Sequence, residues 1–78
     1  MKIYWSGDRK NVIGGQVCAH RLQKNWTQKE LATQLQLLGL ECSDLMILRI
    51  ESGQRFVPDY EVKALAQVLQ VSCETLFG

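Results

Sequence analysis

The segment from Thr27 to Glu30 restricts the fold most, because it fixes the start of a helix. A threonine hydroxyl at an N-cap accepts a hydrogen bond from the backbone N–H three residues later, and a glutamate at that later position accepts one from the threonine N–H. Thr27 and Glu30 have this spacing. Apolar residues at helical spacing follow them, namely Leu31, Ala32 and Leu35. We therefore predict a helix over residues 28–37, ended by Gly39.

One more helix is predicted before this segment and one after it. Apolar residues at helical spacing begin near Val12, and Asn25 ends the pattern because asparagine tolerates the left-handed conformation that follows many helices. After the second helix, Ser43 is a predicted N-cap, and the helix that it opens covers residues 43–52. Gly53 ends that helix.

The last third of the chain completes an all-α pattern. Pro58 opens a fourth helix that ends near residue 71, and Ser72 caps a final short turn. The predicted core residues are Ile13, Val17, Leu31, Ala32, Leu35, Met46, Ile47, Ile50, Val62, Leu65, Ala66, Leu69, Leu76 and Phe77. No segment alternates apolar and polar residues with a period of two, so we expect no sheet. The prediction is one five-helix, all-α domain over residues 12–78, preceded by an irregular arm, residues 1–11.

Charge is distributed unevenly along the chain. The formal net charge is only +1. Residues 1–30 nevertheless carry six lysines and arginines against two acidic residues, whereas residues 31–78 carry three against six. The basic part can supply phosphate contacts, and the alternative is a solvated surface with no charged partner.

Cysteine usage argues against a disulfide framework and against a metal centre. Cys18, Cys42 and Cys73 form no Cys-x-x-Cys pair, and His20 is the sole histidine. Free thiols suit a reducing, cytoplasmic location. We expect no metal, no cofactor, no membrane span and no catalytic constellation, and hence no enzyme. We expect all three cysteines to be small buried or half-buried apolar residues. The alternative concerns Cys42, which lies just before a predicted helix N-terminus that would lower the pKa of its thiol and suit a redox switch.

Several short motifs follow one another along residues 12–78. They are Ile13-Gly14, Arg21, Thr27-Gln28-x-x-Leu31-Ala32, Arg49-Ile50-Glu51-Ser52-Gly53, Leu65-Ala66-x-x-Leu69-x-Val71-Ser72 and Leu76-Phe77. In this order they resemble the phage-repressor, Cro-type (XRE) family of helix-turn-helix proteins. The resemblance implies a lambda-repressor-like bundle with a central helix-turn-helix. It also implies a small transcriptional regulator, more often a repressor than an activator, that binds duplex DNA as a homodimer.

The resemblance assigns roles to individual residues. It pairs Arg21 of the first helix with Glu51 of the third, and it makes Gln28 a donor to a DNA phosphate. The third helix would enter the major groove, where Arg49 suits guanine and Asp44 suits cytosine. The implied DNA-contacting positions are Gln28, Lys29, Ser43, Asp44, Leu45, Leu48, Arg49, Gln54 and Arg55, with Lys24 as a further phosphate candidate.

Two points stay open at the level of sequence. Residues 38–41 are additional to the common family pattern, and they lengthen either the second helix or the turn after it. Leu45 and Leu48 are apolar where the family usually has polar residues. They pack against the additional residues, contact DNA, or bind a protein. The last possibility defines the alternative function, a protein-interaction module such as an antitoxin or an adaptor.

Overall fold

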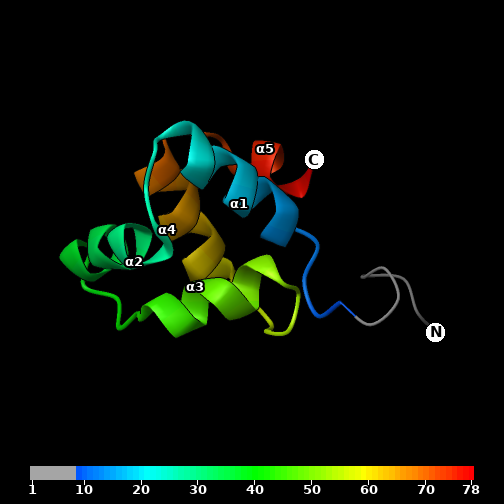
Figure 1. Ribbon diagram of the computed structural model, residues 1–78. Coiled ribbons are helices and arrows are strands. Elements are labelled where there is room, and N and C mark those ends of the chain that lie inside the picture. Colours follow the sequence, from blue (N-terminus) through cyan, green and yellow to red (C-terminus); the bar gives the residue numbers. More distant parts are fainter. Residues whose placement is uncertain (1–8) are drawn as a thin grey trace.

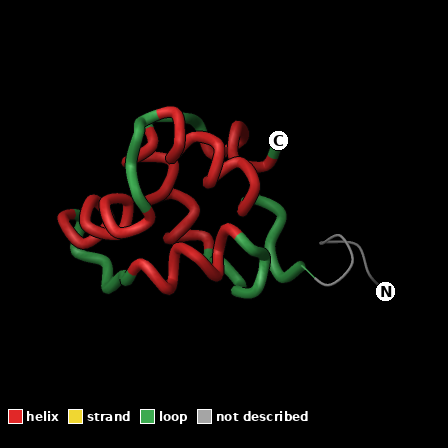
Figure 2. Tube along the Cα trace, viewed as in Figure 1, coloured by secondary structure: helices red, strands yellow, loops and turns green. Residues whose placement is uncertain are grey.

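The computed structural model describes residues 9–78, and in this range the chain forms five α-helices and no strand. The helices are α1 (Gly14–Gln23), α2 (Gln28–Leu37), α3 (Asp44–Glu51), α4 (Asp59–Leu69) and α5 (Cys73–Phe77). Figure 1 shows them packed in one bundle, with α3 along its lower edge. Figure 2 shows that short loops connect them. The predicted five-helix, all-α fold is confirmed, whereas residues 1–8 of the predicted arm lie outside the described residues.

Three helices begin at the predicted N-caps. The Thr27 hydroxyl accepts from the Glu30 N–H at 3.1 Å, and the Glu30 carboxylate accepts from the Thr27 N–H at 2.7 Å, which completes the capping box. The Ser43 hydroxyl accepts from the backbone N–H of Met46 at the start of α3. The Ser72 hydroxyl does the same for Thr75 in α5. These bonds satisfy N–H groups that a helix start otherwise leaves without a partner.

Helices α1 to α4 all end in Schellman motifs. In each motif the residue after the last helical turn has a positive φ, and the next backbone N–H donates to the carbonyl five residues earlier. The positive-φ residues are Asn25, Gly39, Gly53 and Gln70. The corresponding N–H donors lie 2.8–3.2 Å from their carbonyls. The predicted ends at Asn25, Gly39 and Gly53 are confirmed. The glutamine was not predicted, because its side chain carries no signal for this conformation.

The core receives apolar side chains from all five helices. Its largest fully buried members are Ile13, Val17, Leu31, Leu35, Ile47, Ile50, Leu65 and Leu76. Met46 is half-buried and packs against them. The prediction that Phe77 closes the core is wrong, because its side chain is 57% exposed. α5 is short, and within it only Leu76 is buried.

Residues 38–41 lie in the turn between α2 and α3 and do not lengthen α2. α2 ends at Leu37, and Gly39 with φ 94° turns the chain away from the helix axis. The Gln36 amide donates to the Cys42 carbonyl at 2.5 Å, which ties the far end of the connection to the last turn of α2. α3 therefore starts from a fixed position.

Candidate nucleic-acid interface

The outer face of α3 is the candidate interface, and its inner face anchors the helix. Ile47 and Ile50 are fully buried. The opposite face exposes Ser43, Asp44, Leu45, Leu48 and Arg49. Leu45 and Leu48 are 49% and 46% exposed, so the interpretation in which they pack against the α2–α3 turn is wrong. Contact with DNA and contact with a protein both remain compatible with this exposure.

An ion pair fixes α3 to α1. The Arg21 Nε lies 2.7 Å from Glu51 Oε2, and a second guanidinium nitrogen of Arg21 donates to Glu51 Oε1 at 3.1 Å. Both side chains are almost fully buried. A third nitrogen of Arg21 donates to the Trp26 carbonyl at 2.7 Å. The hydrogen bond to Glu51 raises the pKa of Arg21, so the cation is present at any ordinary pH.

Gln28 joins α2 to the same carboxylate. Its side-chain amide donates to Glu51 Oε1 at 3.1 Å, so Glu51 holds α1, α2 and α3 together. An amide NH2 group has two N–H donors, and within residues 9–78 Gln28 uses one of them. Gln28 is half-buried and is the first residue of α2. Gln28 can therefore donate its second N–H to an anion while it keeps the hydrogen bond to Glu51.

Residues before α1 hold the C-terminal end of α3, and the sequence did not reveal this. The Asn11 amide nitrogen donates to the carbonyls of Ile50 and Arg55 at 3.1 and 2.8 Å, and its oxygen accepts from the Gly14 N–H at 2.8 Å. Arg9 donates to the Glu51 carbonyl at 3.2 Å. The approach is close, because a Cβ on Gly14 would overlap the Ile50 carbonyl oxygen. The Asn11–Gly14 bond is local, but the contacts of Asn11 and Arg9 with Ile50, Glu51 and Arg55 join residues 39–44 positions apart, so no local motif could predict them.

The loop after α3 carries two of the implied DNA-contacting positions, Gln54 and Arg55, and they differ in their contacts. Gln54 is exposed. Arg55 forms a bidentate ion pair with the buried Glu61 of α4, at 2.5 and 3.1 Å. The hydrogen bond to Glu61 raises the pKa of Arg55, and the carboxylate neutralises its charge. Lys24 is also engaged, because its ammonium donates to the Gln70 side chain at 2.8 Å.

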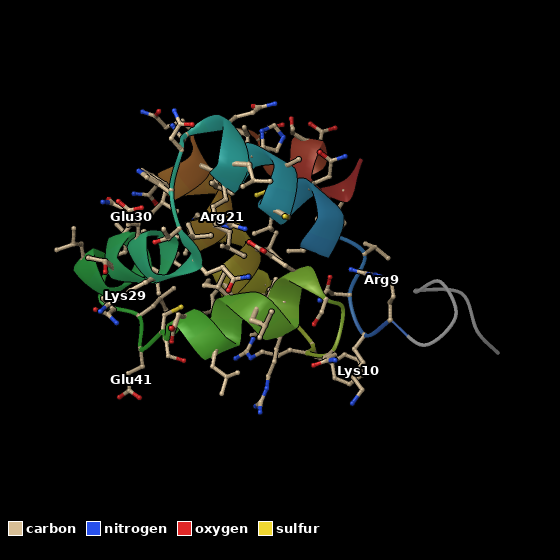
Figure 3. The ribbon with its side chains drawn as sticks, in the orientation of Figure 1. Arg9, Lys10, Arg21, Lys29, Glu30 and Glu41 are labelled. Atoms are coloured by element: carbon tan, nitrogen blue, oxygen red, sulfur yellow. The ribbon has the colours of Figure 1, made fainter. Side chains whose placement is uncertain are left out.

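Charges beside the outer face of α3 are mixed. Arg49 and Lys29 are exposed, and within residues 9–78 neither side chain forms an ion pair or a hydrogen bond. The Asp44 carboxylate accepts from the Leu45 N–H at 2.9 Å, as expected for an acid in a first helical turn. Figure 3 shows Glu41 and Lys10 toward opposite ends of the edge along which α3 runs. Among residues 9–78, Arg49 is therefore the cation on the outer face itself that has no ion-pair partner.

Cys42 is buried, which does not favour the redox switch suggested by its position before a helix. Burial raises the pKa of the Cys42 thiol, which contradicts the lowered pKa inferred from the nearby helix N-terminus. Desolvation of the thiolate is the largest cause of the raised pKa, and the negative charge of Glu61 acts in the same direction. Cys18 is half-buried and Cys73 is exposed. Among residues 9–78 no cluster of histidine, cysteine, aspartate and glutamate could hold a metal ion.

Comparisons with known proteins add no assignment. No model of a protein family matches the chain. No curated protein and no solved structure matches it significantly. Within the described part of the chain, none of the helices has the length and apolar character needed to cross a membrane.

Proposed function

We propose that this protein binds duplex DNA through the outer face of α3 and acts as a small cytoplasmic transcriptional regulator, in the manner of Cro-type repressors. One observation carries the proposal. Arg49 is exposed on the outer face of α3 and has no ion-pair partner in the part of the chain that the structure describes, while the inner face and Glu51 fix that helix to the bundle. A reading helix must meet both conditions, since its side chains need to be free and its backbone needs to be held.

The chemistry of the outer face suits base edges in the major groove. Arg49 has the planar fork of donors that binds guanine O6 and N7 together. Asp44 can accept from cytosine N4, and the exposed methyl groups of Leu45 and Leu48 can contact thymine methyls. Lys29 and the second N–H of Gln28 lie at the start of α2, where the helix N-terminus also favours a phosphate. A single helix reads only a few base pairs, so we propose a homodimer on a two-fold-related site.

A selection from randomised duplex DNA tests this function. We expect a recovered palindrome whose affinity falls with increasing salt, because bound cations release counterions from the phosphates. On that sequence, Arg49→Ala should weaken binding about tenfold to a hundredfold and relax the preference at one base pair. Lys63→Ala, which removes an exposed cation from α4, is the matched control and should bind like the unmodified protein. A folded protein that enriches no sequence and shows no salt-dependent affinity contradicts the proposal.

The second candidate function is protein binding by the same edge of the molecule. It is supported by four leucines on α2, on the α2–α3 turn and on α3, which are 43–75% exposed. They are Leu37, Leu38, Leu45 and Leu48. Leu45→Asp separates the two functions when it is compared with Arg49→Ala. If Leu45→Asp abolishes capture of a protein partner while Arg49→Ala leaves DNA affinity unchanged, the antitoxin or adaptor function replaces the regulator.

A further inference from the structure

Four exposed side chains follow one another around the outer face of α3. Taken around the helix, they are Asp44, Leu48, Leu45 and Arg49. A rotation of about 100° per residue places the two leucines between the carboxylate and the guanidinium. Asp44 and Leu48 are four residues apart, and so are Leu45 and Arg49, so the members of each pair are neighbours on the helix surface. The face therefore presents a hydrogen-bond acceptor, an apolar surface and a fork of donors in succession.

The Asp44 carboxylate keeps an oxygen available for a ligand. Its Oδ1 accepts from the Leu45 N–H at 2.9 Å, and within residues 9–78 its Oδ2 accepts no hydrogen bond. Phosphates repel a carboxylate, so Asp44 favours contact with DNA only where a base offers it an N–H donor. In the major groove, that donor is the amino group on N4 of cytosine or on N6 of adenine. Leu48 then lies against the atoms beside the amino group.

We propose that the outer face of α3 recognises 5-methylcytosine next to guanine in duplex DNA. Unmodified cytosine has the amino group but no methyl group, whereas thymine has the C5 methyl group beside an oxygen that repels a carboxylate. 5-Methylcytosine carries the amino group and the methyl group on neighbouring atoms of one ring, and Asp44 and Leu48 are neighbours on the helix. This inference rests on the proposed DNA function and names the kind of base that it recognises.

The same pair of side chains discriminates between positions of methylation. One hydrogen of a base's amino group pairs with the opposite strand, and the other faces the major groove. A methyl group on N6 of adenine or on N4 of cytosine replaces the hydrogen that faces the groove, which removes the donor that Asp44 requires. A methyl group on C5 leaves that hydrogen in place. An acceptor beside an apolar side chain therefore favours methylation at C5 over methylation at either amino group.

Arg49 accounts for the guanine in the proposed site. Its guanidinium can donate to guanine O6 and N7 together, and it has no ion-pair partner among the described residues. Leu45 is a surface neighbour of both Leu48 and Arg49, so it extends the apolar surface from the methylated base toward the guanine. The leucines are 46% and 49% exposed, which leaves apolar area for a methyl group to cover. Burial of one methyl group should strengthen binding about fourfold.

Two randomised duplex libraries, one with cytosine and one with 5-methylcytosine throughout, test the proposal on the full chain. We expect the enriched site to contain cytosine next to guanine. Fluorescence anisotropy then measures affinity for versions of that site. 5-Methylcytosine should bind about fifteenfold more tightly than cytosine, since each half-site of a dimer contributes about fourfold. Thymine or N4-methylcytosine at the same position should each bind at least about fivefold more weakly than 5-methylcytosine.

Two substitutions separate the methyl contact from the amino contact. Leu48→Asn keeps the size of the side chain but makes its end polar, so the preference for 5-methylcytosine over cytosine should fall below about threefold while the preference over thymine remains. Asp44→Ala should retain the first preference and lose most of the second. Leu22→Asn makes the leucine exchange at an exposed position of α1 and should bind like the unmodified protein. Circular dichroism checks that each variant is folded.

Three results overturn the recognition of 5-methylcytosine. Equal affinity for cytosine and 5-methylcytosine, on a site that is selected and bound with salt dependence, overturns it while the proposed DNA function stands. A methyl preference that survives in the double variant Leu45→Asn/Leu48→Asn also overturns it, because the methyl group then acts through the shape of the DNA. If neither library enriches a sequence, the DNA function fails, and the recognition of 5-methylcytosine fails with it.

Discussion

Replacing Arg21 with methionine should destabilise the protein by about 3 kcal/mol, because it leaves a carboxylate buried without its cation. The figure comes from the lower end of the range of about 3–5 kcal/mol for breaking a buried pair. Two features favour that end. The Glu51 side chain keeps a 7% exposed fraction, and it keeps the hydrogen bond from Gln28 at 3.1 Å. In a domain of this size such a loss is a large part of the total stability.

Urea unfolding followed by far-UV circular dichroism measures this effect. With a slope near 1 kcal/mol per molar urea, the midpoint of Arg21→Met should fall by about 3 M. Arg49→Met is the matched control, since it makes the same exchange on an exposed arginine with no ion-pair partner among the described residues, and its midpoint should hardly move. The double variant Arg21→Met/Glu51→Leu removes the stranded charge and should recover at least about 1 kcal/mol relative to the sum of the single effects. Strictly additive losses would refute the argument, because they would mean that the two side chains do not act as a pair.

Other expected outcomes concern the glycines of α1, the end of α4 and the cysteines. Gly14→Ala should lower the free energy of unfolding by about 2 kcal/mol or more, because the new Cβ meets the carbonyls of α3. Gly15→Ala, whose Cβ meets nothing within 4 Å, should raise it by about 0.5–1 kcal/mol. Urea unfolding measures both, and equal effects would contradict the close approach at Gly14. Gln70→Gly places glycine at a position with a positive φ, removes the strain that a side chain causes there, and should raise the thermal midpoint by a few degrees. A lower midpoint would show that the lost hydrogen bond from Lys24 outweighs the relieved strain. In the folded protein a thiol reagent should label Cys73 rapidly and Cys42 only on unfolding, and rapid double labelling would argue against burial. Because burial raises the pKa of Cys42, its thiolate forms more readily in the unfolded chain, so stability should fall as the pH rises past about 8.5 and Cys42→Ala should weaken that fall.

The helix positions could be predicted because the signals for them are local. The capping box at Thr27, the serine at Ser43 and the left-handed Asn25 each act within about five residues of their own position. Such hydrogen bonds join residues that are close in sequence, so they form together with the helix end that they cap. A local signal takes no account of burial, and at Cys42 it was misleading. The nearby helix N-terminus suggested a lowered thiol pKa, whereas burial in the core raises that pKa.

The contacts that orient α3 could not be predicted from local pattern. Asn11 reaches carbonyls about forty positions further along the chain, and no periodicity or spacing rule relates such distant residues. Arg55 has the sequence context of a surface arginine, yet two of its guanidinium nitrogens donate to the carboxylate of Glu61 on the next helix. The Arg21–Glu51 pair was expected only through family resemblance. Positions decided by tertiary contact need the fold before their partners can be named.

The division of α3 into two sets of side chains has a consequence for how this protein can change. Ile47, Ile50 and Glu51 hold the helix, and none of them belongs to its exposed side. Substitutions at Leu45, Leu48 and Arg49 should therefore leave folding nearly untouched, singly or in combination. Combinatorial libraries at these three positions should therefore consist mostly of folded proteins. Binding preference could then be redesigned, or could change during evolution, without passing through unstable variants.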